Sequence, residues 1–573
     1  MGGVGVRSIA SVFERARSRI RAVNRAGLIV AMAVVSAVVP VARAAPVAAG
    51  PASGDGNVLR VARPSLALPP APGTTAPIPR SLVPDRDAYT RGKARAARRA
   101  GLVVPAGSPR TRGTGPPPPE VLVSRGGVFD PRGTPSDSTG AIGPTRYIEL
   151  VNTRFGIYRR DGSQVSGGNI SSIAHLGQGY PFLTDPQVIW DPTTERFYLV
   201  ILDFDVFARF DTNGFDYVFA YSKSSAPNGA GDWCAYTASF GYDDPDRGRR
   251  RIPDQPHMGD TIHHLMWGVN AFDADTERFL GAEVNWITKP DGGHTCQSPE
   301  AFRTGSEGPL KTATGTRIFT PVAANQTDPG AVGYLMGTRP VGGGGAHKLF
   351  VYRATDHRDG TLGVEVKGRG ISVPQFRMPP PAPQLGGGGR LLDTLDTRLT
   401  QAVSAQDPAK GHLGLWTQHT VEGGAGSAVR WYEIDPVHAE VLQVGTVSDP
   451  DLFAFNGAIS PDRLRRGNTA KFGTTAVIGF DTSSEDTDVA VQMVSKTAQG
   501  EQSEYVKIRQ SPGPNKDFSC SPVCRWGDYS GATPDPGAFL GAGHGRVWLT
   551  NMWNIVGGQN TIDWRTWNWQ AKP

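Results

Sequence analysis

The sequence contains little cysteine, little helical periodicity and, beyond its N-terminal region, no long apolar run. Four cysteines in 573 residues allow at most two disulfides. Apolar residues rarely recur at helical spacing, which argues against a helical protein. No later apolar segment approaches the roughly 20 residues that a membrane-spanning helix needs. The P-loop, the G-x-S-x-G nucleophile elbow and the H-E-x-x-H metal motif are also missing, which removes three common kinds of active site.

The N-terminus has the pattern of an export signal. Arginines between Arg15 and Arg25 precede an apolar run over residues 27–42, and Ala42-Arg43-Ala44 supplies the small residues that a signal peptidase recognises. The run has about 16 residues, fewer than a spanning helix needs. The pattern predicts a signal peptide over residues 1–44, cleaved after Ala44, with an uncleaved membrane anchor as the alternative. We therefore expect a secreted, extracellular monomer with no transmembrane segment after cleavage.

Positive charge is concentrated at the N-terminal end. The whole chain has a net charge of +6. Residues 1–45 carry seven arginines and one glutamate, and residues 46–120 carry eleven basic and four acidic residues. These two segments are +6 and +7, so residues 121–573 have a net charge of −7. An acidic main body argues against a groove that follows nucleic-acid phosphates, and we expect no nucleic-acid partner.

Residues 45–120 have the composition of a linker. Two proline-rich stretches, "PSLALPPAPGTTAPIPR" and "GSPRTRGTGPPPPE", favour extended chain that buries little apolar surface. Between them, residues 85–101 read "DRDAYTRGKARAARRAG". This basic segment is either solvated or a short helix that binds a partner. The composition predicts a basic, largely disordered linker before a main domain over residues 121–573.

The main domain has an all-β pattern. Short runs rich in β-branched and aromatic residues, such as "FDYVFAYSKS" and "AVRWYEI", alternate with Gly, Pro, Asp and Asn. The segments "WDPTTERFYLV" and "FDADTERFLGA" share an Asp-x-x-Thr-Glu-Arg-Phe turn, which predicts equivalent hairpins in two copies of one unit.

Seven strand-like units recur along this domain. They start at "PSDSTGAIG", "LTDPQVIWD", "PDQPHMGDT", "IFTPVAANQ", "LDTLDTRLT", "SDPDLFAFN" and "CRWGDYSGA". Seven starts over about 450 residues give about 65 residues per unit, which suits the four strands of a propeller blade. The pattern predicts a β-propeller with seven blades of four-stranded antiparallel sheet, with six or eight blades as alternatives.

The cysteines are expected to form two disulfides, because the chain carries an export signal. Four cysteines allow three pairings, and the most local one joins Cys520 to Cys524 and Cys234 to Cys296. A zinc site needs four ligands at matched spacing. A redox dithiol more often has two residues between its cysteines. We therefore interpret the segment from Cys520 to Cys524 as a structural loop.

Several of the quoted segments together resemble a known group of proteins. "PSDSTGAIGPTRYIELVNTRFGIY", "LTDPQVIWDPTTERFYLV", "DQPHMGDTIHHLMWGVNAF", "SDPDLFAFNGAIS" and "RWGDYSG" follow in an order that is similar to secreted bacterial propellers described as sialidase-like or BNR-repeat-like. The resemblance implies a propeller fold and little about chemistry. No intact S-x-D-x-G-x-T-W box occurs. An arginine triad and a Tyr/Glu pair cannot be assigned, which argues against sialidase activity.

The starts of the units carry the candidate site residues, because the innermost strands of a propeller open on its central funnel. The candidate catalytic residues are Asp528, Asp185, Asp254, Tyr529 and His257. The candidate substrate-binding residues are Arg525, Arg398, Asp137 and Asp451. Clustered carboxylates raise one another's pKa, which can yield a general acid beside an ionised partner, as glycosidic cleavage requires. The two arginines suit a substrate carboxylate.

Each of these residues also has a structural interpretation. Asp at a strand start often caps backbone groups in a turn. Clustered Asp oxygens suit Ca²⁺, but no Asp-x-Asp-x-Asp spacing supports an EF-hand-like loop. The histidines of "HMGDTIHH" fit ordinary positions better than a metal site, so we expect no cofactor other than a possible Ca²⁺ and no metal ligands.

The sequence therefore favours a propeller that acts on an extracellular glycan or cell-surface polymer. Glycoside hydrolysis by funnel carboxylates is the leading hypothesis, although the sequence does not establish that the protein is an enzyme. A non-catalytic binding or adhesion propeller is the alternative. A polysaccharide lyase that uses His257 and Tyr529 is a further alternative.

Overall fold

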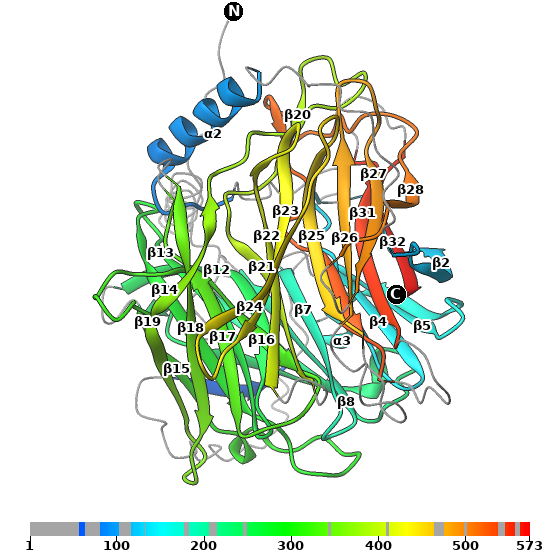
Figure 1. The fold of residues 1–573 in the computed structure, drawn as a ribbon. Helices are drawn as coiled ribbons and strands as arrows, with labels where there is room; N and C mark the ends of the chain where they lie inside the picture. Colours follow the sequence, from blue (N-terminus) through cyan, green and yellow to red (C-terminus); the bar gives the residue numbers. More distant parts are fainter. Residues whose placement is uncertain are drawn as a thin grey trace, which may run out of the picture.

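Antiparallel four-stranded sheets repeat along the chain in a computed structural model (Figure 1). The structure describes residues 57–62, 81–101, 116–131, 133–176, 183–204, 215–244, 249–341, 345–407, 412–462, 475–497, 501–536, 545–555 and 562–573. The predicted signal peptide over residues 1–44 lies outside these residues, as does most of the predicted linker. No helix within the described ranges is long and apolar enough to cross a membrane.

The first four sheets are blades 1 to 4, each numbered from its innermost strand outward. Blade 1 contains β3 (Thr139–Ile142), β4 (Arg146–Val151), β5 (Arg154–Arg159) and β6 (Gln164–Asn169). Blade 2 contains β7 (Leu183–Asp191), β8 (Arg196–Asp203), β9 (Asp216–Ser222) and β10 (Trp233–Ser239). Blade 3 contains β12 (Arg249–Asp260), β13 (His264–Asp273), β14 (Phe279–Thr288) and β15 (Thr304–Glu307). Blade 4 contains β16 (Phe319–Gln326), β17 (Val332–Thr338), β18 (Ala346–Asp356) and β19 (Leu362–Phe376).

The remaining three blades complete the ring, and blade 5 shares one sheet with blade 4 through parallel pairing of their innermost strands. Blade 5 contains β21 (Leu399–Asp407), β22 (His412–Gly423), β23 (Gly426–Asp435) and β24 (Glu440–Val447). Blade 6 contains β25 (Phe453–Pro461), β26 (Ala476–Ser483), β27 (Ala490–Lys496) and β28 (Val506–Gln510). Blade 7 contains β30 (Gly531–Pro534), β31 (Val547–Asn554), β32 (Trp564–Lys572) and the N-terminal strand β2 (Glu120–Gly126).

The seven blades form a closed propeller. Their innermost strands contact one another in the order β3, β7, β12, β16, β21, β25, β30 and back to β3. Strand β2 pairs antiparallel with β32, so the two ends of the domain share the last blade, as Figure 1 shows beside the C-terminus. The predicted all-β, seven-bladed propeller is confirmed, and all seven predicted unit starts coincide with an innermost strand.

The prediction of two equivalent hairpins is wrong in one respect. The first Asp-x-x-Thr turn joins β7 to β8, the two innermost strands of blade 2, whereas the second joins β13 to β14, the middle strands of blade 3. The turns themselves agree, because Asp191 and Asp273 each accept hydrogen bonds from two backbone N–H groups and a threonine hydroxyl. The motif therefore specifies a turn and not a place in the blade.

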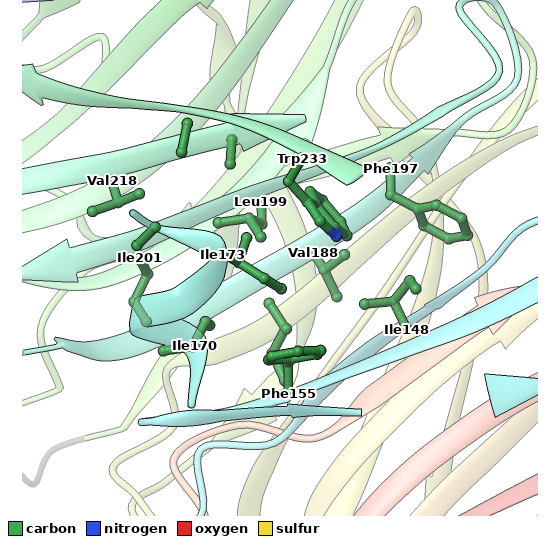
Figure 2. Close-up of a cluster of buried hydrophobic side chains, with 14 of the residues drawn as sticks. Ile148, Phe155, Ile170, Ile173, Val188, Phe197, Leu199, Ile201, Val218 and Trp233 are labelled. Atoms are coloured by element: carbon green, nitrogen blue, oxygen red, sulfur yellow. The ribbon is translucent and has the colours of Figure 1, made fainter. Parts of the chain in front are cut away.

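Aromatic and aliphatic side chains fill the spaces between blades. Figure 2 shows one such cluster, in which Ile148 and Phe155 of blade 1 pack with Leu199 and Trp233 of blade 2. The short helix α3 (Ile170–Ile173) contributes to the same cluster. A blade buries both faces of its sheet only between two neighbours, so the closed ring buries the inner strands, while outermost strands such as β19 and β24 keep exposed residues.

Both predicted disulfides are present. Cys234 in β10 bonds to Cys296 over an S–S distance of 2.04 Å, which ties blade 2 to the segment that follows β14 in blade 3. Cys520 bonds to Cys524 and closes the small loop that leads to β30. That loop is held further by the two-residue strand β29 (Val523–Cys524), which pairs with β20 (Leu391–Leu392). The cysteines therefore clasp loops, and none is free in the described chain.

Parts of the predicted linker pack on the propeller. Strand β1 (Val58–Val61) adds to the outer edge of blade 2 beside β10. Helix α2 (Arg86–Ala100) begins at Asp85, whose side chain accepts a hydrogen bond of 2.8 Å from the Ala88 N–H. The basic segment is thus a helix and not a solvated coil. Of the predicted linker over residues 45–120, the structure describes residues 57–62, 81–101 and 116–120.

Candidate functional site

Each innermost strand begins with a kink at the same end of the ring. Residues with a left-handed backbone stand there in every blade: Asp137, Asp185, Gln255, Thr320, Leu395 and Thr397, Asn456, and Gly527. The pairing register of β7, β12, β16 and β25 shifts at these residues, and that of β21 shifts shortly after Thr397, between Leu399 and Gln401. Such bulges redirect side chains at strand ends. The repeated kink therefore gathers polar groups from different blades around one mouth of the central channel.

Hydrogen bonds across the axis join four blades at this mouth. The Tyr529 hydroxyl, from the segment that leads into blade 7, donates to Asp185 Oδ2 of blade 2 over 2.9 Å. The Asp528 N–H donates to Asp137 Oδ1 of blade 1 over 3.3 Å. Gln255 Nε2 of blade 3 donates to Asp528 Oδ2 over 3.5 Å. We call the group Asp137, Asp185, Asp254, Gln255, His257, Arg398, Arg525, Asp528 and Tyr529 the funnel cluster.

Asn152 holds two of these carboxylates in place from the β4–β5 turn. Its Nδ2 donates to Asp137 Oδ2 over 2.8 Å. Its Oδ1 accepts hydrogen bonds from the Asp185 N–H and the Thr184 hydroxyl, over 2.9 and 3.1 Å. Because one amide fixes both strand starts, the relative position of the two carboxylates is set by blade 1.

Each arginine of the cluster is paired with a carboxylate of the protein. Arg398 Nε and Nη2 contact the two oxygens of Asp396 over 2.6 and 2.8 Å, a bidentate pair. Arg525 pairs with Asp528, three residues further along the chain. These pairs reduce the positive charge that either arginine presents to a ligand.

The carboxylates of the cluster lie in contrasting environments. Burial, together with the negative charge of Asp185, raises the pKa of Asp254 to about 8. Burial also raises the pKa of Asp185, but hydrogen bonds from Thr184, Tyr529 and the backbone of Gln255 oppose that rise. Asp254 is therefore protonated at neutral pH, whereas Asp185 has donors that stabilise its ionised form.

Two further titratable groups are held neutral. Burial, with the nearby charge of Arg398, lowers the pKa of His257 to about 3. Burial and the charges of Asp185 and Asp137 raise the pKa of Tyr529 well above its usual value. The two rings lie against each other with centroids 5.1 Å apart. Neither ring carries charge at neutral pH.

Several buried polar atoms of the cluster have no protein partner. Within the described part of the chain, these are Asp254 Oδ2, Gln255 Oε1, His257 Nε2, Arg398 Nη1 and Asp528 Oδ1. Buried polar atoms are nearly always hydrogen-bonded in folded proteins. Five such atoms from three blades at one mouth are the features of a site that binds a polar ligand.

The segment from Ser81 to Gly101 covers one side of the mouth. Arg398 Nη2 donates to the Leu82 carbonyl over 3.3 Å, and Leu82 packs on Phe319. Lys93 of α2 donates to Thr394 Oγ1 over 2.9 Å and lies 3.8 Å from Asp393. The cover extends over blades 3 to 5. Thr184, Asp185, Asp254 and Arg525 are partly exposed, so the cover leaves part of the mouth open.

The channel beneath the cluster is narrow. A cavity of about 40 Å³ lies among the innermost strands, lined by residues that include Thr139, Gln187, Met258, Asn325, Gln401 and Tyr529. That volume holds about three water molecules. A sugar therefore has room only at the mouth and not along the axis.

The structure brings together eight of the nine predicted site residues: Asp137, Asp185, Asp254, His257, Arg398, Arg525, Asp528 and Tyr529. Asp451 is placed elsewhere, since it is exposed in a turn where its N–H donates to Asp449 over 2.8 Å. The strand start of blade 6 instead presents Asn456, which donates to Asp481 and Asn551.

Sequence reasoning missed three residues of the site. Gln255 stands next to the predicted Asp254, and Asn456 stands at the kink of its strand, so the recurring unit starts could have indicated both. Asn152 lies in the turn between the two middle strands of blade 1 and has no comparable signal. In the described chain, no group of three His, Cys, Asp or Glu side chains is arranged to hold a metal ion. The Ca²⁺ expectation stays a prediction.

Comparisons with known proteins give similarity of fold only. No protein-family model matches the chain, and no curated protein matches it. A sialidase from Trypanosoma rangeli is 9% identical, with a TM-score of 0.34 over 75% of this chain and 59% of the sialidase. The chain thus spans less than two thirds of that protein.

Two other solved structures are similar to the same degree. An α-L-arabinanase from Penicillium chrysogenum is 11% identical, with a TM-score of 0.33 over 68% of this chain and 93% of the arabinanase. The endosialidase of phage phi92 is 8% identical, with a TM-score of 0.31 over 69% of this chain and 70% of that chain. At these scores the similarities carry no weight for activity, and the fold assignment rests on the strand pairing described above.

Proposed function

We propose that the protein is a glycan-acting enzyme that hydrolyses glycosidic bonds at the open side of the funnel mouth. The observation that carries the proposal is the contrast between Asp254 and Asp185. Asp254 is protonated at neutral pH because its pKa is about 8, and its Oδ2 has no protein partner. Asp185 accepts hydrogen bonds from the Tyr529 and Thr184 hydroxyls, which stabilise its charge. Glycosidic cleavage needs one protonated carboxyl group and one carboxylate. We assign the proton to Asp254 and the charge to Asp185, whose hydrogen bonds oppose the rise in pKa that burial causes.

The roles follow from these environments. Asp254 donates its proton to the glycosidic oxygen as the bond to the leaving group breaks. Asp185 supplies the negative charge, either by attacking the anomeric carbon or by taking a proton from the attacking water. Arg525, paired with Asp528, contributes positive charge that opposes the rise in pKa which burial causes at Asp528.

A lyase mechanism has less support from the same geometry. Elimination needs a base that takes a proton next to a carboxylate of the sugar. His257, the predicted base, has a pKa of about 3 and is therefore a weak base. Tyr529 uses its hydroxyl proton on Asp185 and so is not free to act as a general acid.

A non-catalytic binding propeller is the second candidate. The observation that favours it is the cover formed by residues 81–101, which buries Arg398 to 1% exposure. A binding protein tolerates a partly covered funnel, whereas an enzyme must admit a substrate and release a product. The open side at Asp185 and Asp254 favours the enzyme.

We further propose that the protein is secreted and works on a glycan outside the cell as a monomer, with residues 1–44 removed on export. The two disulfides agree with an oxidising compartment. Sequencing the N-terminus of the mature chain tests this, and a chain that begins at Pro46 or retains the apolar run would contradict cleavage after Ala44. Sedimentation at several concentrations tests the oligomeric state.

The hydrolysis proposal is tested with the purified full-length mature chain against a panel of polysaccharides, with release of reducing ends as the readout. We expect one glycan to be cleaved, and Asp254→Asn and Asp185→Asn each to lower kcat at least about a hundredfold. Asp451→Asn is the matched control, because Asp451 is exposed outside the cluster, and it keeps full activity. Absence of cleavage across the panel favours the binding propeller.

A further inference from the structure

The positive charges around the mouth are already committed within the protein. Arg398 uses Nε and Nη2 on Asp396, and Nη2 also donates to the Leu82 carbonyl, so Nη1 alone remains. Arg525 is paired with Asp528. Recognition of a sugar carboxylate ordinarily uses the two-pronged fork of an arginine. Arg398 cannot offer that fork, because its Nε and Nη2 both bond to Asp396, and Nη2 of Arg525 already bonds to Asp528.

Neither an anionic nor a cationic ligand can form hydrogen bonds with all of the unpartnered atoms of the cluster. A carboxylate only accepts hydrogen bonds, and it would face the acceptors Asp528 Oδ1 and Gln255 Oε1. An ammonium only donates, and it would face Arg398 Nη1. Asp254 and His257 adapt to either, because Asp254 is protonated at neutral pH and the His257 ring is neutral.

The unpartnered atoms thus divide into acceptors, a donor and two groups that can be either. A hydroxyl donates one hydrogen bond and accepts two, so it satisfies every member of this set. These atoms are buried among three blades, so each hydrogen bond that a ligand fails to make is costly. The pattern of donors and acceptors therefore selects between ligands. All four residues other than Asp254 are at least nine-tenths buried.

We propose that the funnel cluster binds an uncharged, hydroxyl-rich sugar and selects against acidic and amino sugars. This inference rests on the proposed function only for the identity of the site, because it concerns what binds and not whether a bond is cleaved. The sugar enters from the side of Asp185 and Asp254, since the segment from Ser81 to Gly101 covers blades 3 to 5. Its hydroxyls bond to Gln255 Oε1, Asp528 Oδ1 and Arg398 Nη1.

The test measures binding by calorimetry with the full-length mature protein and three sets of hexasaccharides. The neutral set contains gluco-, manno-, galacto- and arabino-oligosaccharides, the acidic set contains oligogalacturonate and sialylated oligosaccharides, and the cationic set contains de-acetylated chitohexaose. We expect at least one neutral sugar to bind about tenfold more tightly than every charged one. High salt is expected to leave that affinity unchanged, because no charge on the ligand is screened.

Variants connect the binding to the cluster. Gln255→Leu removes a hydrogen-bond acceptor while nearly keeping the size of the side chain. We expect it to lower the affinity for the neutral sugar about tenfold. Gln443→Leu, on blade 5 away from the mouth, is the matched control and leaves affinity unchanged. Thermal unfolding of both variants checks that they fold.

Each outcome bears on one of the two proposals. Three results overturn the neutral-sugar inference. They are tighter binding of an acidic or a cationic hexasaccharide, no binding of any sugar, and an affinity that Gln255→Leu leaves unchanged. Neutral sugars that bind but are never cleaved support the inference while contradicting hydrolysis. Cleavage of an acidic polymer contradicts the inference and leaves hydrolysis standing.

Discussion

The Tyr529 hydroxyl donates a hydrogen bond of 2.9 Å to Asp185 Oδ2, and so connects the start of blade 7 to the start of blade 2. Blade 1 lies between them in the ring. The contact crosses the mouth of the funnel and supplies Asp185 with a donor that favours its ionised form. It couples the position of one blade to the chemistry of another.

Tyr529→Phe is expected to impair catalysis more than stability. The loss of the hydroxyl raises the pKa of Asp185 further, because a hydrogen bond to the charged form is removed. We expect kcat/KM to fall at least about tenfold and the free energy of unfolding to fall by about 1 kcal/mol. Kinetics on the cleaved glycan and urea unfolding measure the two. Tyr505→Phe, at a tyrosine packed on Phe480 in another part of the ring, is the control, and equal losses in both variants would contradict the role of Tyr529.

The pH–rate profile is expected to follow Asp254. With a pKa of about 8, this group is protonated and able to donate below pH 8, and kcat/KM declines above it. Asp254→Asn removes that alkaline limb together with most of the rate. Measuring kcat/KM from about pH 4 to about pH 10 checks this, because the range extends to both sides of the expected pKa. If the residual activity of Asp254→Asn still declines above about pH 8, the alkaline decline belongs to another group.

Stability is expected to depend on pH through the same residue. The pKa of Asp254 is about 8 in the folded protein, against about 4 in an unfolded chain. Between these values the folded state holds a proton that the unfolded state has lost, so the contribution of Asp254 is complete below about pH 4 and is lost as the pH rises through about 8. Urea unfolding at several pH values measures this. As the pH rises, the free energy of unfolding should decline less for Asp254→Asn than for the parent chain.

Helix α2 is expected to depend on Lys93 for its docking. Lys93 is 7% exposed and donates to Thr394 Oγ1 and the Leu395 carbonyl. Lys93→Met leaves those acceptors and Asp393 without their buried cation, so amide exchange in residues 86–100 should accelerate about tenfold or more, while the blades stay protected. Arg91→Met, at an exposed position of the same helix, is the control. Equal amide-exchange rates in both variants would show that the apolar contacts of Leu82 are enough to hold the helix on the propeller.

The two disulfides are expected to contribute unequally. Cys234 and Cys296 close a loop of 62 residues, whereas Cys520 and Cys524 are only four residues apart. By loop-closure entropy, replacing the first pair with serines should cost about 4 kcal/mol and replacing the second about 2 kcal/mol. Denaturant unfolding of the two double variants measures the difference, and the reverse order would point to strain or to structure in the unfolded chain.

The fold was predictable because its signal is repeated. Each blade opens with a polar or proline-containing start before an apolar strand, and seven copies make the period visible although any one copy is weak. The turn shared by Asp191 and Asp273 was less informative, since its hydrogen bonds are local and serve any hairpin. A local signal fixes a turn, while only the periodic one fixes a place in the ring.

The site was predictable in part for the same reason. Asp185, Asp254 and Asp528 stand at strand starts, so a propeller brings them together. Asp451 stands near a start too, but blade 6 has its kink at Asn456, five residues later, which leaves Asp451 in solvent. The hydrogen bonds of Lys93 and Leu82 with the start of blade 5 join residues 302 and 316 positions apart. Composition alone indicated only that the segment is basic.

Strand β2 has a consequence for the order in which the molecule is assembled. It pairs with β32, and the contact between Ser124 and Trp567 spans 443 residues of chain. A ribosome finishes the first partner long before the last one exists. Until then the outer edge of β32 is either unmade or open, and an open strand edge invites pairing with other molecules. Removing β2 should therefore lower the yield of soluble protein, even though the funnel is built entirely by other strands.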